Sequence, residues 1–307
     1  MSASKKKIYI FGCIMWDVVG KPVERISSGK DCSGIITEGP GGVAFNVALG
    51  LSKVLTANSF ELNLVSVIGK NEKTQIIYSS LIENDIKTKY MTVKGSQNDT
   101  YLSIEKENGE IFGSINSSDV FLSSQNDIKE IFSYICARHK QSHNKAILIF
   151  DGNCPREFFD FVKKETEEEI FTKYFIPANF SKLNEFKNDA HYFKGFNLFI
   201  NLREANVLIG SPSFNNSIDA SKAIFEKIKT ETNLIIVTDG PNVACGVSKK
   251  QIARVKPSMI KEKVSRLGAG DAFFAYFLSY RELNPDASIN ESLSAADEKT
   301  QTFLKNK

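Results

Sequence analysis

The stretch Ser265-Arg266-Leu267-Gly268-Ala269-Gly270-Asp271, followed at once by AFFAYF over residues 272–277, is the most informative part of the chain. Glycines on both sides of an alanine let the backbone turn tightly and approach a ligand closely. The apolar run predicts the first turns of a buried helix, whose opening amides carry partial positive charge and attract an anion such as phosphate. Asp271 adds a carboxylate that can accept a proton. An anion site beside a base is typical of phosphoryl transfer.

The same residues also fit an ordinary turn with Asp271 as the helix cap. Short glycine motifs match by chance often, so the rest of the chain has to distinguish the two interpretations. Two common phosphate motifs are absent from the sequence. Gly69-Lys70 lacks the preceding glycine and the following Ser or Thr of a P-loop, and Gly39-Pro40-Gly41-Gly42 lacks the spacing of the dinucleotide fingerprint.

Composition narrows the class of protein. Of the 307 residues, 42% are hydrophobic and 24% are charged, which is enough for a sizeable core. A net charge of +3 without a long basic stripe argues against nucleic-acid binding. The 5 cysteines are scattered and form no Cys-x-x-Cys pair, which favours reduced thiols and a cytoplasmic location. Because the sequence has no apolar signal core and no run of about eighteen apolar residues, we expect neither secretion nor contact with a membrane.

Strand-like and helix-like segments alternate along the chain. Short apolar runs predict buried strands at residues 7–13, 62–68, 145–150, 198–200 and 234–237. Helical spacing or a helix start signal follows them, at residues 43–55, 75–83, from about 155, 269–281 and 290–303. This alternation predicts an α/β fold with a mostly parallel central sheet and helices on both of its faces.

Two segments do not fit the alternation. Asn108-Gly109 separates residues 100–104 from 110–115 and is a strong signal for a β-hairpin turn. Residues 17–38 are interrupted by Gly and Pro and suggest a loop with short strands. We expect the segments at about 18–38 and 98–115 to form a small β lid that excludes water from the site.

Polar residues follow several of the predicted strands. Open α/β sheets bind their ligands beyond the carboxyl ends of the strands. The residues found at such positions are Asp17, Asp151, Asn201 and Asp239.

Three short motifs occur along the chain, namely Gly41-Gly42-Val43-Ala44-Phe45-Asn46-Val47-Ala48, Asn201-Leu202-Arg203-Glu204 and Gly268-Ala269-Gly270-Asp271. In their order and spacing they resemble the ribokinase (PfkB) family of sugar and nucleoside kinases, over residues 8–300. The resemblance implies a ribokinase-like three-layer fold and a single kinase domain over residues 1–307. It also implies ATP- and Mg²⁺-dependent phosphorylation of an alcohol group on a small sugar or nucleoside.

The resemblance assigns the catalytic and metal roles. Asp271 would be the base for the acceptor hydroxyl, and the amides of Gly268, Ala269 and Gly270 would hold the transferring phosphoryl group. Asn201 and Glu204 would hold Mg²⁺, mainly through water, because Mg²⁺ keeps much of its hydration shell. Asn201 and Glu204 also fit a plain strand-to-helix turn.

The acceptor positions follow from the first motif and the lid. Asp17, Gly41, Gly42 and Asn46 match the positions at which the family binds its acceptor. A carboxylate and an amide suit neighbouring sugar hydroxyls, although Asp17 also fits a loop cap. Thr100 and its neighbour Tyr101 either touch the acceptor base or occupy plain exposed lid positions.

Residues 238–243 (TDGPNV) resemble the nucleotide-side stretch of the family. Val243 stands where its second glycine is expected. The resemblance gives five nucleotide contacts, namely Thr238, Gly240, Asn242, Gly268 and Gly270.

Three segments resemble the pseudouridine kinase branch, namely 41–48, 151–155 (DGNCP) and 176–182 (IPANFSK). They add Asp151, Asn153 and Lys182 as acceptor contacts, and they favour conversion of pseudouridine to pseudouridine 5′-phosphate. Ile176 and Phe45 depart from the pattern of that branch. Another family substrate (ribose, adenosine or a hexose) and a non-catalytic nucleoside-binding relative are the alternatives.

Two properties are left open by the sequence. Ser265 and Arg266 replace the residue pair common near the monovalent-cation site of the family, so potassium dependence is not predicted. The protein is expected to be a monomer or a homodimer, since an exposed lid edge can pair across a dimer.

Overall fold

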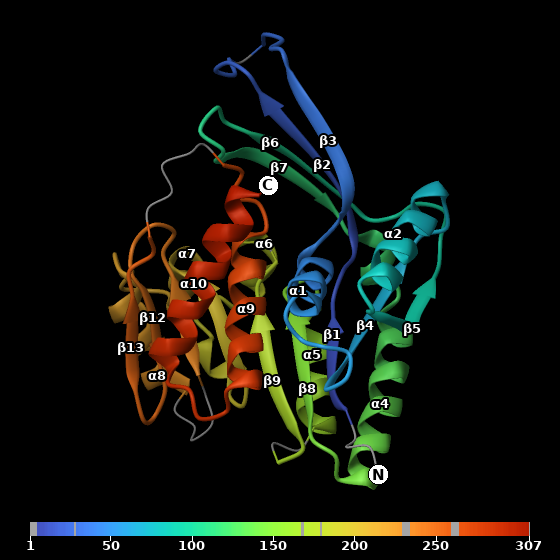
Figure 1. Ribbon diagram of the computed structural model, residues 1–307, viewed down its shortest axis with the longest axis vertical. Helices are drawn as coiled ribbons and strands as arrows, with labels where there is room; N and C mark the ends of the chain where they lie inside the picture. Colours follow the sequence, from blue (N-terminus) through green and yellow to red (C-terminus); the bar gives the residue numbers. More distant parts are fainter. Residues whose placement is uncertain are drawn as a thin grey trace.

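A computed structural model describes residues 5–27, 29–166, 169–178, 180–228, 234–258 and 264–306 (Figure 1). A large sheet crosses the molecule, and a smaller sheet stands above one end of it, at the top of Figure 1. Helices lie on both faces of the large sheet.

In the described part of the chain, the large sheet has nine strands in the order β13-β12-β11-β10-β9-β8-β1-β4-β5. In this order, neighbouring strands pair in parallel from β11 through β10, β9, β8, β1 and β4 to β5. The strand β12 pairs antiparallel with both β11 and β13. The strands are β1 (Lys6–Phe11), β4 (Phe60–Ile68), β5 (Lys87–Val93), β8 (Ala146–Asp151), β9 (Phe171–Ile176), β10 (Asn197–Asn201), β11 (Ile235–Thr238), β12 (Ala244–Val247) and β13 (Ile252–Val255).

The large sheet separates two hydrophobic cores. Successive side chains of a strand point to opposite faces, and in β1 this places Ile8 and Ile10 in one core and Tyr9 and Phe11 in the other. Strands that bury both faces are apolar throughout, as the runs in the sequence indicated. The predicted three-layer α/β fold with a mostly parallel sheet is confirmed.

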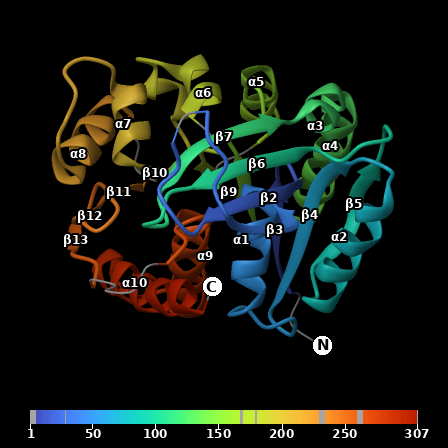
Figure 2. The ribbon, with the colours of Figure 1, turned by 90° about the horizontal axis from the view of Figure 1, so that it is seen from above.

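The helices divide between the two faces (Figure 2). One face carries α1 (Val43–Ser52), α2 (Glu72–Glu83), α9 (Ala269–Leu283) and α10 (Ile289–Lys305). The other carries α3 (Asp119–Ser123), α4 (Gln125–Ser142), α5 (Arg156–Glu165), α6 (Phe180–Leu183), α7 (Leu202–Ile209) and α8 (Ser217–Ile228), with the 3₁₀ turns η1 (Asn184–Phe186) and η2 (Ala190–Phe193). Within the described ranges, no helix combines the length and apolar character needed to cross a membrane.

The smaller sheet is the predicted lid. Its order is β3-β2-β6-β7, with β2 (Met15–Pro22), β3 (Gly34–Gly41), β6 (Thr100–Glu105) and β7 (Ile111–Ser117). Where short strands in a loop were expected, β2 and β3 are regular strands of 8 residues each. Asp17 pairs with Tyr101, and Tyr101 pairs with Asn116, so these three side chains share one face of the lid.

Candidate active site

Two neighbouring cavities differ in their surroundings: the first lies between the carboxyl ends of the large sheet and the lid, and the second lies between the end of β11 and the helices α9 and α10. The first has a volume of about 330 Å³, and its polar lining residues are Asp17, Asn46, Tyr101, Asn116, Asn153, Asn201, Glu204, Thr238, Arg266 and Asp271. The second has a volume of about 350 Å³ and is lined by residues that include Asn108, Gly240, Pro241, Phe273 and Gln301. Four residues line both cavities, namely Thr238, Arg266, Ala269 and Gly270. The cavities therefore meet at the loop before α9.

That loop, residues 265–271, is called the glycine loop below. Gly268 is the N-cap of α9 and has φ 72°, a left-handed conformation that glycine adopts without strain. The amide of Ala269 donates to the carbonyl of Arg266 at 3.1 Å. Of the three amides that the sequence predicted to bind an anion, the Ala269 amide therefore already has a hydrogen-bond partner within the turn. The Gly270 amide lies in the first turn of α9, where amides have no partner within the helix.

Asp271 lies half-buried in the first turn of α9 and lines the first cavity. The side-chain amide of Asn46, on α1, donates to its Oδ2 atom at 2.9 Å. The carboxylate that the sequence identified as a base thus faces the cavity from the glycine loop, with one oxygen oriented by Asn46.

Asn201 and Glu204 form a reciprocal cap at the start of α7. The Glu204 amide donates to Asn201 Oδ1 at 3.0 Å, and the Asn201 amide donates to Glu204 Oε2 at 2.8 Å. The turn that the sequence offered as an alternative is therefore present. Both residues also line the first cavity. Burial, with a smaller contribution from the negative charge of Asp271, raises the pKa of Glu204 to about 7.

The oxygen atoms at Glu204 are suitable ligands for Mg²⁺. A carboxylate whose pKa is raised by burial and by a second carboxylate gains from a cation beside it. The Oε1 atom of Glu204 is not used by the cap, and hard oxygen ligands suit Mg²⁺. Among the described residues, no group of three or more His, Cys, Asp or Glu side chains could hold a metal.

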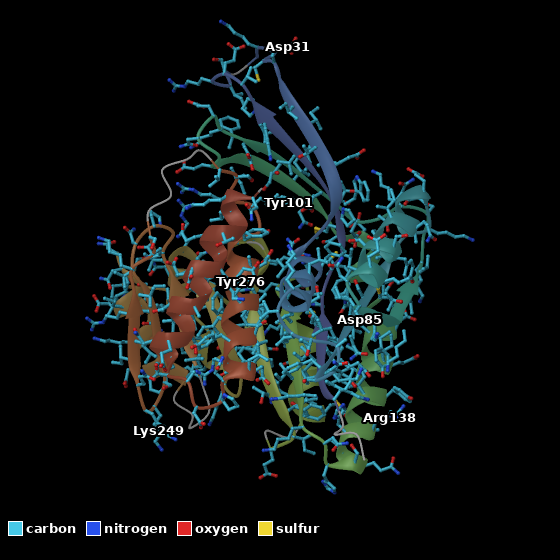
Figure 3. The ribbon with its side chains drawn as sticks, in the orientation of Figure 1. Asp31, Asp85, Tyr101, Arg138, Lys249 and Tyr276 are labelled. Carbon is cyan, nitrogen blue, oxygen red and sulfur yellow. The ribbon has the colours of Figure 1, made fainter. Side chains whose placement is uncertain are left out.

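The acceptor end of the first cavity combines lid and helix residues. Asp17 comes from β2, and Tyr101, labelled in Figure 3, comes from β6. Gly42 is the N-cap of α1 with φ 88°, and a Cβ atom there would lie 2.5 Å from the carbonyl oxygen of Cys13. Gly41 does not line the cavity, and a Cβ on it would lie 2.0 Å from the Asp17 carboxylate.

Asp151 and Lys182, which the sequence predicted as acceptor contacts, do not line either cavity. Asp151 is only 1% exposed and accepts bonds from the Cys13 amide at 2.9 Å and the Asn153 amide at 2.8 Å. Its burial raises its pKa to about 6. Lys182 donates to Asn153 Oδ1 at 3.0 Å and to Ser118 Oγ at 2.8 Å. Both residues orient Asn153, which does line the cavity.

Two further predicted contacts lie outside the cavities. Thr100 is on the lid face opposite to Tyr101, and its hydroxyl donates to the carbonyl of Asn98 at 3.2 Å. Asn242 is exposed, and its side-chain amide donates to Asp239 at 3.1 Å. Of the predicted nucleotide contacts on this strand end, Thr238 and Gly240 line the second cavity.

The sequence analysis missed Asn116 and did not give Arg266 a role. Part of the signal for Asn116 was available, because the Asn108-Gly109 turn indicated that its strand pairs with that of Tyr101. The turn itself pairs Lys106 with Glu110, and a register shift between Ile104 and Glu105 places Asn116 opposite Tyr101. No comparable sequence signal marks Met15, which lines the cavity from β2.

The family model of the pfkB family carbohydrate kinases matches residues 5–298. No curated protein sequence matches the chain. Among solved structures, the chain is similar to a carbohydrate kinase from Agrobacterium tumefaciens (20% identity, 98% of this chain and 91% of that chain, TM-score 0.74). It is also similar to adenosine kinase from Sinorhizobium meliloti (14% identity, 99% and 94% covered, TM-score 0.74) and to Arabidopsis thaliana ribokinase complexed with ribose and ATP (16% identity, 99% and 93% covered, TM-score 0.67). At such identities, the likeness to these structures concerns the fold.

Proposed function

The chain belongs to the pfkB family of carbohydrate kinases, and from this premise we propose that it transfers the γ-phosphoryl group of ATP to a ribose hydroxyl of a small acceptor. One observation carries the proposal. Ala269 and Gly270 of the glycine loop line both cavities, and Asp271 follows them in the first. A nucleotide in the second cavity and an acceptor in the first would therefore meet at this loop.

Asp271 would take the proton of the acceptor hydroxyl while the hydroxyl oxygen forms a bond to the γ-phosphorus and ADP leaves. The bond from Asn46 holds the carboxylate at the cavity wall. The Gly268 and Gly270 amides would stabilise the charge on the transferring group. Phosphoryl transfer depends mainly on positioning and charge neutralisation, so a carboxylate of ordinary basicity is sufficient.

Glu204 and Asn201 are the residues that would hold Mg²⁺, mainly through water, where it would neutralise phosphate charge. The raised pKa of Glu204 supports this assignment, because a nearby cation favours its ionised form. The cap between the two residues fixes their orientation at the start of α7.

The acceptor we propose is pseudouridine, phosphorylated at its 5′ hydroxyl. The two later segments with the pseudouridine-kinase resemblance lie side by side, since the Gly152 amide donates to the Ile176 carbonyl at 2.8 Å. They reach the first cavity through Asn153 and through Pro177 and Ala178. Asn179, part of the second segment, lies outside the described residues. Asp17, Asn46 and Asn153 supply donors and acceptors for ribose and base, and Tyr101 supplies an aromatic face.

A panel of acceptors with an ATP-consumption readout tests this proposal. We expect far more turnover with pseudouridine than with uridine, ribose, adenosine or fructose. Equal or greater turnover with one of the others would replace the acceptor and keep the kinase. An absence of turnover with every acceptor, together with nucleoside binding measured by calorimetry, would instead support a non-catalytic relative.

A further inference from the structure

We infer that Arg266 is a catalytic residue that neutralises charge on the transferring phosphoryl group, a role which rests on the proposed kinase function. Arg266 stands two residues before Gly268 and lines both cavities. Among the described residues, it is the only cationic side chain that lines either of them.

The charge around the first cavity requires such a group. Asp17, Glu204 and Asp271 all line it. A nucleotide triphosphate would bring several more negative charges to the place where the two cavities meet. A guanidinium there can bind two phosphate oxygens at once through its planar fork of donors.

The side chain of Arg266 is loosely held. Its Nη1 atom is 3.9 Å from Oε1 of Glu110, next to β7, and the two side chains are 56% and 45% exposed. Exposed ion pairs of this kind contribute little to stability. A phosphate group can therefore displace Glu110 as the partner of Arg266 at small cost.

The backbone of Arg266, in contrast, is held firmly by the lid. The hydroxyl of the preceding residue, Ser265, donates to the buried Glu105 of β6 at 2.5 Å. Gly109, at the hairpin turn, packs so closely on the Val264 carbonyl that a Cβ would lie 2.4 Å from its oxygen. A fixed backbone with an exchangeable guanidinium is the arrangement that delivers a cation to a ligand.

The lid hairpin also reaches the nucleotide side. Asn108 at its turn lines the second cavity together with Arg266. The lid that covers the acceptor therefore positions a group that serves the nucleotide. This assigns a role to the position at which the sequence departs from the residue pair common in the family.

Steady-state kinetics of Arg266→Ala, Arg266→Lys and the control Arg254→Ala test the inference. Arg254 is exposed on β13 and lines neither cavity, so its loss removes the same charge elsewhere. We expect Arg266→Ala to lower kcat about a hundredfold, as the loss of one transition-state donor does, with little change in acceptor KM. The kcat of Arg266→Lys should lie between those of Arg266→Ala and the wild type. Free guanidinium at millimolar concentration should restore part of the kcat that Arg266→Ala loses. Arg254→Ala should match the wild type.

Two results would overturn the inference, namely a normal kcat for Arg266→Ala, or a loss that guanidinium does not restore. Turnover by the wild type reports separately on the proposed function. If the wild type turned over no acceptor, the kinase proposal would fail first. Calorimetry would then test Arg266 alone, because its loss should weaken MgATP binding much more than MgADP binding. An unchanged ratio of the two affinities would contradict the role of Arg266.

Discussion

The side-chain amide of Asn46 donates a 2.9 Å hydrogen bond to the carboxylate of Asp271, which is 225 positions away in the sequence. The packing of α1 on α9 explains the contact. A Cβ on Gly50 would lie 2.6 Å from the Cβ of Ala275, so the two helices approach closely there. Asn46 precedes Gly50 on α1 by four residues, and Asp271 precedes Ala275 on α9 by four residues. Four residues are about one helical turn, so Asn46 and Asp271 lie on the helix faces that pack together. The glycine thus allows the acceptor-side helix to position the proposed base.

Replacement of Asn46 tests this contact. Asn46→Ala should lower kcat about tenfold or more, because a hydrogen bond to a charged group contributes about 1.5–3 kcal/mol. Asn46→Asp should be more damaging, since it places a second carboxylate beside Asp271. Steady-state kinetics of both variants provide the measurement. Wild-type kcat in Asn46→Ala would show that this bond has no role in the reaction.

Gly42→Ala should destabilise the fold and impair acceptor binding. The new Cβ would meet the Cys13 carbonyl at 2.5 Å, and the backbone at φ 88° and ψ 152° strains a residue with a side chain by about 1–3 kcal/mol. Gly39→Ala is the matched control in the same segment, because a Cβ there meets no atom within 4 Å. Thermal melting of the two variants should show a lower Tm for Gly42→Ala alone. Equal melting temperatures would contradict this account of the turn.

Asp151→Asn should change both stability and acceptor binding. The pKa of Asp151 rises from 3.8 to about 6 in the folded protein, so the native state holds its proton more tightly than the unfolded chain. Its contribution to stability is therefore present at low pH and falls as the pH rises between these values. Chemical denaturation from pH 4 to pH 7 should show a weaker decline in Asp151→Asn than in the wild type.

Burial also raises the pKa of Asp99. Because Asp99 is present in both the wild type and Asp151→Asn, its effect on the pH dependence of stability cancels when the two are compared. The acceptor KM should rise in Asp151→Asn because the amide replaces one of the oxygens that orient Asn153. Parallel stability curves would remove Asp151 as a titrating group. An unchanged KM would remove it as the support of Asn153.

Ser265→Ala should loosen the contact between the lid and the glycine loop. It leaves the buried carboxylate of Glu105 without this hydroxyl donor, at a cost of about 1–3 kcal/mol. Ser103→Ala, two residues before Glu105 on β6, is the control. Ser103 is 1% exposed, and its hydroxyl has no hydrogen-bond partner among the described residues, so its removal should be neutral. Melting curves in which both variants behave alike would argue against the contact.

The sequence predicted the layers and the lid because buried parallel strands and tight turns leave strong local signals. The sequence analysis missed strands and helices in which polar residues interrupt the apolar pattern. Strand β9 has the sequence FTKYFI and contains Lys173, a residue type that usually indicates an exposed position. Lys173 is nevertheless buried, with 5% of its surface exposed, and its amine donates to the Thr166 hydroxyl at 3.0 Å. The strand β5 and the helices α4 and α8 are partly polar and likewise gave no clear signal. Such segments are determined by tertiary packing more than by local pattern.

The site was predicted as a set of residues but not as a geometry. Motifs identified Asp271, Asn46 and Glu204, all of which line the first cavity. They could not show that Asp151 ends its strand as a buried support, because side-chain direction at a strand end depends on the register with its neighbours. For the same reason Lys182, which bonds Asn153 from another segment, resembled a ligand contact.

The central claim is that Asp271, at the loop where the two cavities meet, accepts the acceptor proton during transfer from ATP. The most direct test compares ATP consumption by the wild type and by Asp271→Asn with pseudouridine, alongside calorimetric ATP binding. We predict that Asp271→Asn loses about a hundredfold to ten-thousandfold in kcat, the range of general base catalysis, and still binds ATP. Turnover by Asp271→Asn at the wild-type rate would contradict the claim.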